Sequence, residues 1–503
     1  MLFVVFYFNC NKVIAQDKRG NVFIFGGSGV GAIFTDTARP QTYRYYPVAT
    51  NHHFMDGHSN ICDSAIGNLL LVCNGMILID SIGNIIENGD SLQPNKIYNH
   101  NCCPTQTVTT DGSIILPKGS NGEYYVFVPT ITDSAYDYYV VGAQNKVPYD
   151  LLQYHVVDMN ANGGMGKVVQ KNVPLLTHVE MCKVGMMTCK HANGYDWWLL
   201  KQALDTNMIY TFLVTKDSVV LKSIQGFPTP HFGYYDLAGQ SCFNYTGSKY
   251  AFATGGGFMN NMGAHLFISD FDRCYGIVSN VKTIAVPYDS TMTTLDTLNG
   301  PMDSLITGIC FSPNDSFLYV SRRYNIYQYD LFEPDSNQRW TRIQAGPDTT
   351  QLYFGEYKNL VLGPDGRIYV SKYTCSPFHN SVIDYPNKKG MACGFCKLCL
   401  RYDPGPCTSA MPNMPNFNMP KKEPCWPLSQ SDSGEPRADW SVYPNPAFQT
   451  IFIKNAKGKK KTLLDISGQN ILSTTKDEID VNGLSKGLYF LYCDGIAKKV
   501  LVE

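Results

Sequence analysis

The chain has 503 residues, which is enough for two or three domains and a large buried core. Aromatic residues make up 13% of it and favour β structure, whereas charged residues make up only 17%. The net charge is −1 and the basic residues are scattered, so there is no electrostatic basis for binding nucleic acid. The one basic run, residues 457–461, is interpreted as a solvated loop.

The first 16 residues, MLFVVFYFNCNKVIAQ, consist of a short apolar run followed by Val13, Ile14 and Ala15. Small residues after such a run are typical of a secretory signal peptide, which we predict over residues 1–16. No positive charge precedes the apolar run, and the alternative is a buried first strand. No later segment reaches 18 consecutive apolar residues, so no transmembrane span is predicted.

Residues 21–25 (NVFIF) predict a β-strand, and a glycine-rich run follows it over residues 26–31 (GGSGVG). A dinucleotide site would need a later third glycine and a following helix, and the sequence has neither. We therefore interpret the run as a bend that leaves an edge strand.

No catalytic, metal or cofactor site is predicted. His52, His53 and His58 lie near Asp56, but no HExxH pattern accompanies them and a polar loop is the simpler interpretation. The chain has no Gly-x-Ser-x-Gly elbow, and pairs of aspartates such as Asp270 and Asp272 are common in β turns.

One pattern recurs through the middle of the chain: a turn of Asn, Asp, Thr or Gly followed by an aromatic-rich strand. Its second turn position falls at residues 67, 122, 194, 247, 315 and 366. The intervals are close to the length of a propeller blade with long loops. Small sheets with two apolar faces must stack on one another, which predicts a ring. Trp197 and Trp198 are expected in the core between blades.

The predicted fold class is therefore all-β, with a β-propeller over residues 17–374. Six or seven blades fit the repeat, and seven are favoured if the strand at residues 21–25 completes a blade with material from the C-terminal side. A stack of β-sandwich domains is the alternative.

Residues 375–439 form a Cys- and Pro-rich segment that is predicted to close the propeller and lead into a linker. The chain has 17 cysteines, and export makes disulfides the expected state. Six probable disulfide cysteines lie here: Cys375, Cys393, Cys396, Cys399, Cys407 and Cys425. The spacing of Cys393, Cys396 and Cys399 would also suit zinc, with Cys407 as a fourth ligand, which is the alternative.

The last 64 residues, 440–503, read as a small all-β module. Tyr443-Pro444-Asn445-Pro446 predicts a turn, because its two prolines forbid a helix. Strand-like runs follow at residues 450–454, 461–466, 487–492 and 498–502, separated by glycines. We expect a β-sandwich.

This tail resembles the C-terminal sorting domain of the type IX secretion system (type A). The resemblance rests on four elements in order, whose marker residues are Tyr443, Pro444, Asn445, Pro446, Asp465, Gly468, Leu484, Gly487 and Tyr489, with residues 498–502 at the end. It implies type IX machinery as a partner and removal of the tail. It also implies a secreted or cell-surface location outside the outer membrane.

Residues 20–420 are similar to a family of secreted bacteroidetal proteins with WD40-like propeller blades and sorting tails. The similarity rests on turn and packing segments, among them residues 62–70, 190–194, 311–314 and 362–366, and on the prolines of residues 411–417 (MPNMPNF). It implies a fold and brings no catalytic residues.

The favoured function is a non-enzymatic binding or interaction module for an unknown extracellular ligand, either a glycan or a protein. One alternative is a polysaccharide-active hydrolase or lyase with its site in the propeller channel. The other is a structural or adhesion protein of the cell surface.

Overall fold

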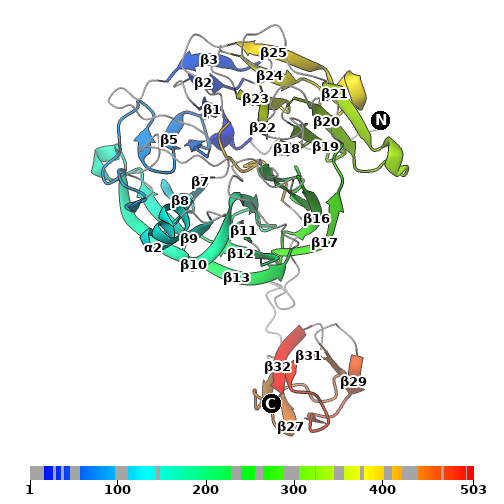
Figure 1. Ribbon diagram of the computed structural model, residues 1–503. Helices are drawn as coiled ribbons and strands as arrows, with labels where there is room; N and C mark the ends of the chain where they lie inside the picture. The colour runs from blue at the N-terminus through cyan, green and yellow to red at the C-terminus, as the bar shows by residue number, and fades with distance from the viewer. Residues whose placement is uncertain are drawn as a thin grey trace, which may run out of the picture. The chain divides into compact units, whose positions relative to one another are not determined.

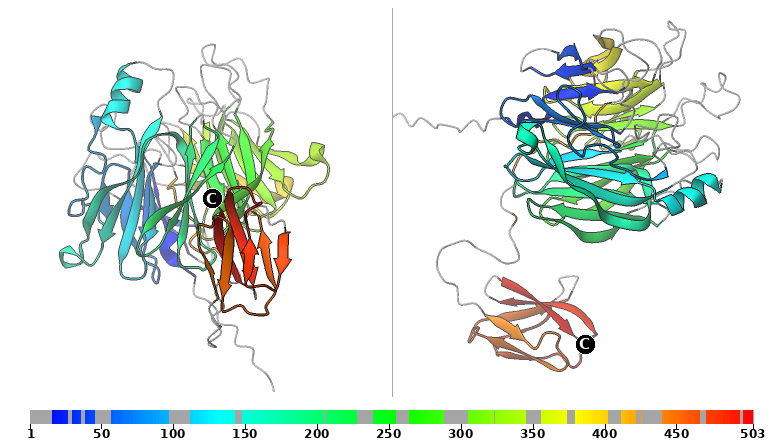
Figure 2. Two further views of the ribbon diagram at one scale, coloured as in Figure 1. Left: turned by 90° about the horizontal axis from the view of Figure 1, so that it is seen from below. Right: turned by 90° about the vertical axis from the view of Figure 1, so that its left-hand side faces the viewer.

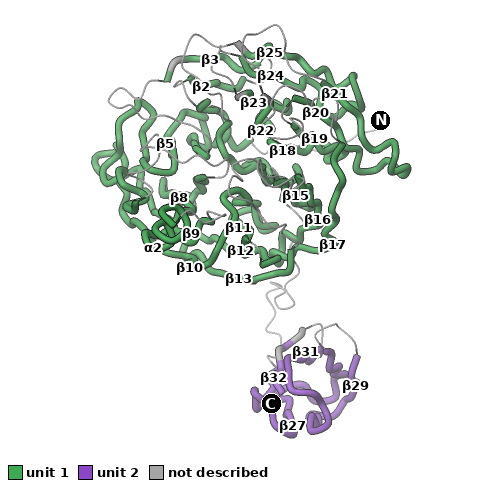
Figure 3. Tube along the Cα trace, viewed as in Figure 1, with its two compact units in different colours: residues 1–422 green, residues 423–503 purple. Residues whose placement is uncertain are grey.

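A computed structural model gives the fold of the chain. It describes residues 16–26, 30–35, 39–45, 57–96, 112–142, 148–204, 206–227, 239–254, 264–287, 305–322, 324–344, 356–373, 379–401, 411–421, 425, 440–465, 470–493 and 496–502. The chain divides into two compact units, residues 1–422 and residues 423–503 (Figure 3). The predicted signal peptide lies almost entirely outside the described residues and stays a prediction.

The first unit is a ring of seven antiparallel blades, as favoured from the sequence (Figure 1). Blade 1 contains β1 (Val22–Phe25), β2 (Val30–Ile33) and β3 (Gln41–Arg44). Blade 2 contains β4 (Ser59–Cys62), β5 (Leu69–Cys73) and β6 (Leu78–Asp80). Blade 3 contains β7 (Ile114–Pro117), β8 (Glu123–Thr130), β9 (Tyr149–Asp158) and the first half of β10 (Lys167–Lys190).

Blade 4 contains the second half of β10, β11 (Trp197–Ala203), β12 (Met208–Val214) and β13 (Val219–Gly226). Blade 5 contains β14 (Gly239–Phe243), β15 (Lys249–Thr254), β16 (Leu266–Asp272) and β17 (Ile277–Ile284). Blade 6 contains β18 (Ile306–Phe311), β19 (Phe317–Arg322), β20 (Ile326–Asp330) and β21 (Trp340–Gln344). Blade 7 contains β22 (Glu356–Leu362), β23 (Ile368–Tyr373), β24 (His379–Ile383) and β25 (Phe395–Arg401). The first strand of each blade lies toward the centre of the ring (Figure 1).

Strand β10 joins blades 3 and 4 into one continuous seven-stranded sheet. Its first part pairs with β9 and its last part pairs with β11, and the register shifts between Met181 and Met186. The outer strand of blade 3 thus becomes the inner strand of blade 4 without a loop. Sequence spacing alone could not reveal this, because a turn normally separates neighbouring blades.

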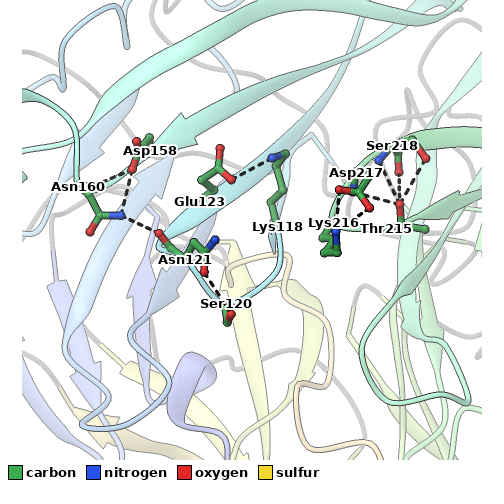
Figure 4. Close-up of polar contacts among 10 residues, drawn as sticks. All are labelled: Lys118, Ser120, Asn121, Glu123, Asp158, Asn160, Thr215, Lys216, Asp217 and Ser218. Carbon is green, nitrogen blue, oxygen red and sulfur yellow. Dashed lines mark hydrogen bonds and ion pairs between the residues drawn. The ribbon is translucent and has the colours of Figure 1, made fainter.

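The recurrent turns join the first two strands of blades 2 to 7. Each counted position has a positive φ: Gly67 (87°), Gly122 (76°), Gly194 (81°), Gly247 (70°), Asp315 (59°) and Gly366 (77°). Figure 4 includes this turn in blade 3, where Asn160 Nδ2 donates to the carbonyl of Asn121 at 2.6 Å. The positive φ favours glycine at position 122, and a Cβ there would also displace the Asn160 amide, whose Nδ2 would lie 2.8 Å away.

The side chains between blades form the core, as predicted. Trp197 and Trp198 are 1% and 3% exposed and belong to the largest buried cluster, which spans blades 2 to 5. His191, at the start of a repeat turn, accepts the backbone N–H of Asn193 on Nδ1 at 3.0 Å. This histidine therefore supports the turn.

The ring closes without a shared strand. Strand β1 pairs with β2 in its own blade, so the prediction that residues 21–25 complete a blade with C-terminal material is wrong. Blade 1 instead packs on blade 7 through an apolar cluster that includes Phe23, Phe34 and Tyr369. Arg39 and Asp384 add an ion pair of 2.6 Å across the same seam. A complete blade 1 was possible because β2 and β3 supply its remaining strands.

Helical structure is sparse in the described residues. α2 (Asp133–Tyr136) and η2 (Asp137–Val141) follow β8 and project from one face of the ring (Figure 2). Short 3₁₀ turns are η1 (Lys18–Gly20), η3 (Asn162–Gly164), η4 (Ser336–Gln338) and η5 (Gly390–Cys393). None of the helices in the described part of the chain has the length and hydropathy of a membrane span.

Most described cysteines carry free thiols. Cys396 and Cys399 form a disulfide, as expected, but Cys393 is a free, buried thiol, so the disulfide prediction is wrong for it. Its side chain packs in the cluster between blades 6 and 7, where it also interacts with the hydroxyl of Tyr319. Cys425 is disulfide-bonded, and Cys375 and Cys407 lie outside the described residues.

The other cysteines that carry thiols lie on blade strands and in the tail. They are Cys62, Cys73, Cys182, Cys189, Cys242, Cys310 and Cys493. Single cysteines on blade strands serve as small apolar core residues. At these described positions the cysteine side chains are held by packing and not by cross-links.

The buried thiols predict a specific pattern of chemical labelling. Burial raises the pKa of Cys62, Cys189 and Cys310 to about 12. At about pH 8 these thiols should resist iodoacetamide in the native chain and react after unfolding in urea, because the thiolate is the nucleophile. Peptide mapping by mass spectrometry measures this. Native labelling of these three would contradict their burial.

The same pKa shifts predict loss of stability in alkali. From pH 9.0, the ordinary pKa of a cysteine, up to about 12, the unfolded chain releases these protons and the folded chain retains them. The free energy of unfolding should therefore fall as the pH rises through this window. Urea denaturation at a series of pH values tests the sign, and a flat profile would argue against the shift.

The second unit is a two-sheet β-sandwich, as predicted. One sheet contains β26 (Ser441–Tyr443), β27 (Thr450–Lys454) and β30 (Glu478–Asp480); the other contains β28 (Lys461–Leu464), β29 (Asn470–Thr474), β31 (Gly487–Cys493) and β32 (Ile496–Val502). Trp440, Ile451 and Leu491 lie in the core between them.

Within the basic run at residues 457–461, the ammonium of Lys461 is wholly buried and bonds Asp477 at 2.6 Å. Interpreting the whole run as a solvated loop is therefore wrong at this position.

Candidate functional site

The segment 411–421 runs inside the propeller ring, and we call it the plug. In Figure 1 it is the gold trace near the centre, inside the first strands of the blades. Its sequence, MPNMPNFNMPK, has prolines at 412, 415 and 420. Proline fixes φ and lacks an N–H, so these three positions cannot donate to a strand ladder, and the segment has no strand and turns at residues 417–418.

Asn413 fixes the plug to the inner edges of three blades. Its backbone N–H donates to the carbonyl of His58 at 2.8 Å. Its side-chain Nδ2 donates to the carbonyls of Ser113 and Met186, at 3.1 and 3.4 Å. The side chain is 6% exposed, so these bonds satisfy polar groups that water does not reach.

Two cations hold the end of the plug through backbone carbonyls. Lys190 Nζ donates to the carbonyl of Phe417 at 2.9 Å, and Arg273 Nη1 donates to that of Pro420 at 2.8 Å. Arg273 also bonds the carbonyls of Lys190 and Thr246, at 2.7 and 2.9 Å. Burial lowers the pKa of both Lys190 and Arg273. The arginine thus links the turns of blades 4 and 5 to the plug.

The N-terminal end of the described chain pairs with the plug. Asn418 Oδ1 accepts the N–H of Asp17 at 2.8 Å, and Asn418 Nδ2 donates to the carbonyl of Asp17 at 3.0 Å. Phe417 packs edge-on against Trp197, with ring centroids 5.7 Å apart. The plug therefore contacts residues from both ends of the ring and from its middle.

A cavity of about 370 Å³ lies between the plug and the inner strands of blades 4 to 7, with Phe23 of blade 1 also in its lining. Its inner part is lined by Thr188, Gln240, Cys310 and Asn413. Toward the repeat turns it is lined by Tyr245, Pro313, residues 363–366 and Asn416. The cavity therefore extends along the channel to the mouth on the side of the repeat turns.

The described lining of this cavity contains no Lys, Arg, His or Glu, and its single carboxylate is already bonded. Asp365 Oδ2 contacts Arg367 Nη1 at 2.9 Å and accepts the hydroxyl of Tyr369 at 2.8 Å. Burial raises the pKa of the Cys310 thiol to about 12, which keeps it protonated. The lining thus offers amides, hydroxyls and apolar surface rather than charge.

Two inner-strand side chains in the lining differ in their hydrogen bonding. Gln240 is satisfied: Oε1 accepts the N–H of Ile309 and of Leu360, at 3.1 and 3.2 Å, and Nε2 donates to the carbonyl of Leu360 at 2.9 Å. Thr188 is 1% exposed, and its buried hydroxyl has no hydrogen-bond partner among the described residues. A buried hydroxyl without a partner is uncommon and calls for an explanation.

Only part of this site carries a signal in the sequence. The prolines of residues 411–417 were identified as a family feature, but their place in the channel was not predicted. The tripeptide Met-Pro-Asn occurs twice in succession, at residues 411–413 and 414–416, and this repeat was the available sign of an extended segment. Thr188 carries no sequence signal, because an isolated threonine on a strand is ordinary.

The histidine and glycine candidates do not form a site. His58 Nε2 lies 2.6 Å from the carbonyl of Ile24 and links blades 1 and 2. His52, His53 and Asp56 lie outside the described residues, and among those described no cluster of His, Cys, Asp or Glu could hold a metal ion. The glycine run spans the turn between β1 and β2, and residues 27–29 lie outside the description.

The residues predicted as the sorting motif lie on both sheets of the second unit. Tyr443 ends β26, and Asn445 Oδ1 accepts the N–H of Leu501 in the last strand at 2.8 Å. Pro444 and Pro446 flank Asn445 in this bend. The hydroxyl of Tyr489 donates to the carbonyl of Ser485 at 2.8 Å, beside Leu484 and before Gly487. Asp465 is described, whereas Gly468 is not.

Residues 441–502 match the family described as a secretion system C-terminal sorting domain. The match covers the strands of the β-sandwich and supports a type IX sorting C-terminus. The chain therefore carries the sorting domain of a protein exported by type IX secretion, to the cell surface or the exterior. No curated protein matches the chain.

Solved structures resemble the chain only distantly. A candidate 6-phosphogluconolactonase from Bacteroides uniformis has 11% identity and a TM-score of 0.40, over 78% of this chain and 98% of its own. A second from Bacteroides fragilis has 12% identity and a TM-score of 0.34, over 70% and 96%. Hydrazine synthase of Kuenenia stuttgartiensis has 12% identity and a TM-score of 0.33, over 72% and 95%.

Proposed function

We propose that the protein is an extracellular ligand-binding propeller without chemistry of its own, delivered by its sorting domain. The finer assignments belong to the same proposal: a type A sorting domain, WD40-like blades, and removal of the tail after export. The ligand binds in the cavity beside the plug, at the channel mouth on the side of the repeat turns.

The observation that carries this proposal is the cavity itself. Its volume of about 370 Å³ lies in the lower part of the range for small-molecule sites. A few polar groups lie among apolar and aromatic side chains, which is the usual composition of such sites.

Binding is favoured over hydrolysis by the state of the lining groups. Glycoside hydrolysis uses two carboxyl groups that flank the substrate. Here the described lining has one, Asp365, and its oxygens are bonded to Arg367 and Tyr369. The arrangement is suited to holding a ligand rather than to transferring its protons.

A glycan and peptide array probed with the full-length chain tests the proposal. We expect retention of a defined ligand, which mass spectrometry then recovers unchanged. Recovery of a cleaved product would replace the binding module with an enzyme. Absence of any ligand across both arrays would favour a structural or adhesion role.

A further inference from the structure

We infer that the cavity beside the plug takes the ring of an uncharged sugar, and that the hydroxyl of Thr188 is one of its hydrogen-bond partners. The inference rests on the proposed binding function and adds the chemical class of the ligand. Four features of the cavity carry it.

The first feature is the lack of charge. The described lining side chains include no cation, and the one carboxylate is neutralised by Arg367 at 2.9 Å. A charged ligand would lose its hydration without gaining a partner of opposite sign, which costs free energy. Phosphorylated, sulfated and uronic acid groups are therefore disfavoured.

The second feature is the mixture of surfaces. Phe243, Tyr245 and Phe417 supply aromatic rings, and Asn413 and Asn416 supply amides. A sugar ring has apolar C–H faces and a rim of hydroxyls, so it can use both kinds of surface at once. The volume of about 370 Å³ suits a mono- or disaccharide unit.

The third feature is the unpartnered hydroxyl. Thr188 lines the cavity, and its Oγ1 is buried without a hydrogen-bond partner among the described residues. A hydroxyl can both donate and accept, as can each hydroxyl of a sugar. A ligand hydroxyl beside Thr188 would remove the cost of leaving this group unbonded.

The fourth feature argues against a peptide. Peptides that bind in an extended form rely on backbone hydrogen bonds to their receptor. At blades 6 and 7 the backbone N–H groups of Ile309 and Leu360 are taken by Gln240. The plug uses the carbonyls of Ser113 and Met186 on the other side. At these described positions the inner-strand backbone groups are already bonded and are not open to a second chain.

Methyl NMR of the full-length chain with ¹³C-labelled methionine methyl groups tests the inference. Met187, Met414 and Met419 line the cavity, whereas Met165 and Met391 are 64% and 70% exposed elsewhere. The probes are neutral mono- and disaccharides, glucuronic acid, a sulfated sugar, and a synthetic MPNMPNF peptide. We expect a neutral sugar to shift the three cavity methyls and leave the two exposed ones unchanged.

Thr188→Val tests the hydrogen bond. The methyl replaces an unpartnered hydroxyl, so the fold should be kept while sugar affinity falls about fivefold to tenfold. Thr307→Val is the matched control: Thr307 lies on inner strand β18 and bonds the carbonyl of Ser321 at 3.2 Å, outside the cavity lining. It should leave sugar affinity unchanged.

The outcomes separate the inference from the proposed function. Binding of a charged sugar or of the peptide at the cavity methyls would overturn the sugar class and leave the binding site standing. Neutral sugars that shift only distant methyls, or that bind Thr188→Val normally, would overturn the assigned contact. If the arrays also find no ligand of any class, the proposed function fails as well.

Discussion

A chain that ends at Arg401 should unfold at much lower urea concentration than one that ends at Lys421. Both lack the sorting domain and both keep β25, but only the longer one keeps the plug. Met411, Phe417 and Met419 are 3%, 3% and 5% exposed in the ring. Burying three such side chains stabilises a fold by about 5 kcal/mol or more, a large part of the stability of a typical domain. Equilibrium denaturation followed by circular dichroism measures the difference.

A point variant measures the contribution of one plug side chain to stability without deleting any residues. Phe417→Ala in the full-length chain removes the ring that packs on Trp197 at 5.7 Å. It should cost about 3 to 5 kcal/mol, the usual range for a buried Phe→Ala change. Lys222→Ala, on the exposed outer strand β13, is the control and should change stability by less than about 0.5 kcal/mol. Equal midpoints for all these chains would mean that the ring closes without the plug.

Deletion of residues 440–503 should keep the protein in the periplasm of a type IX-competent bacterium. The deleted part is the sorting domain matched over residues 441–502. Surface accessibility to an added protease and cell fractionation measure the result. Normal display of the shortened chain would refute the role given to the tail.

Two point variants test whether export requires a folded sorting domain or only the presence of its residues. Leu491 is fully buried in the core of the sandwich, so Leu491→Asp should unfold the tail and block export like the deletion. Lys476 is exposed, and Lys476→Ala should be exported normally. Protease resistance of the retained propeller checks that the ring itself has folded. Export of Leu491→Asp at the normal level would mean that the folded sandwich is not what the machinery recognises.

The repeat turns were predictable because they depend on local geometry. Gly122 and Gly366 stand where the backbone needs a positive φ, and that requirement is met within a few residues. The aromatic strands beside them, such as β8 and β23, follow from alternation and composition. The same holds for the tail, where Pro444 and Pro446 fix a bend whatever surrounds it.

The closure of the ring was not predictable in the same way. Strand β1 has the same local pattern whether it completes a blade with C-terminal strands or begins its own. The choice was decided by β2 and β3, and by packing of Phe34 of the first blade against Tyr369 of the last, with ring centroids 5.3 Å apart. The continuous strand β10 likewise depends on which neighbours each half finds.

The cysteines also show that the tertiary structure decides what local sequence cannot. Their number and the export signals favoured disulfides, but pairing requires two cysteines to be brought within a few ångströms. Cys396 and Cys399 meet this condition along β25, whereas Cys62, Cys189 and Cys310 lie on inner strands of different blades and are packed as free thiols.

The sequence by itself therefore determined a chain of turn-and-strand units followed by a sorting domain, because turns, strand periodicity and proline bends are local properties. Only the tertiary structure decided that seven blades close by packing, that residues 411–421 fill the channel, and that Thr188 lines a neutral cavity beside them. Those features join residues hundreds of positions apart, and no local pattern specifies which distant groups will meet.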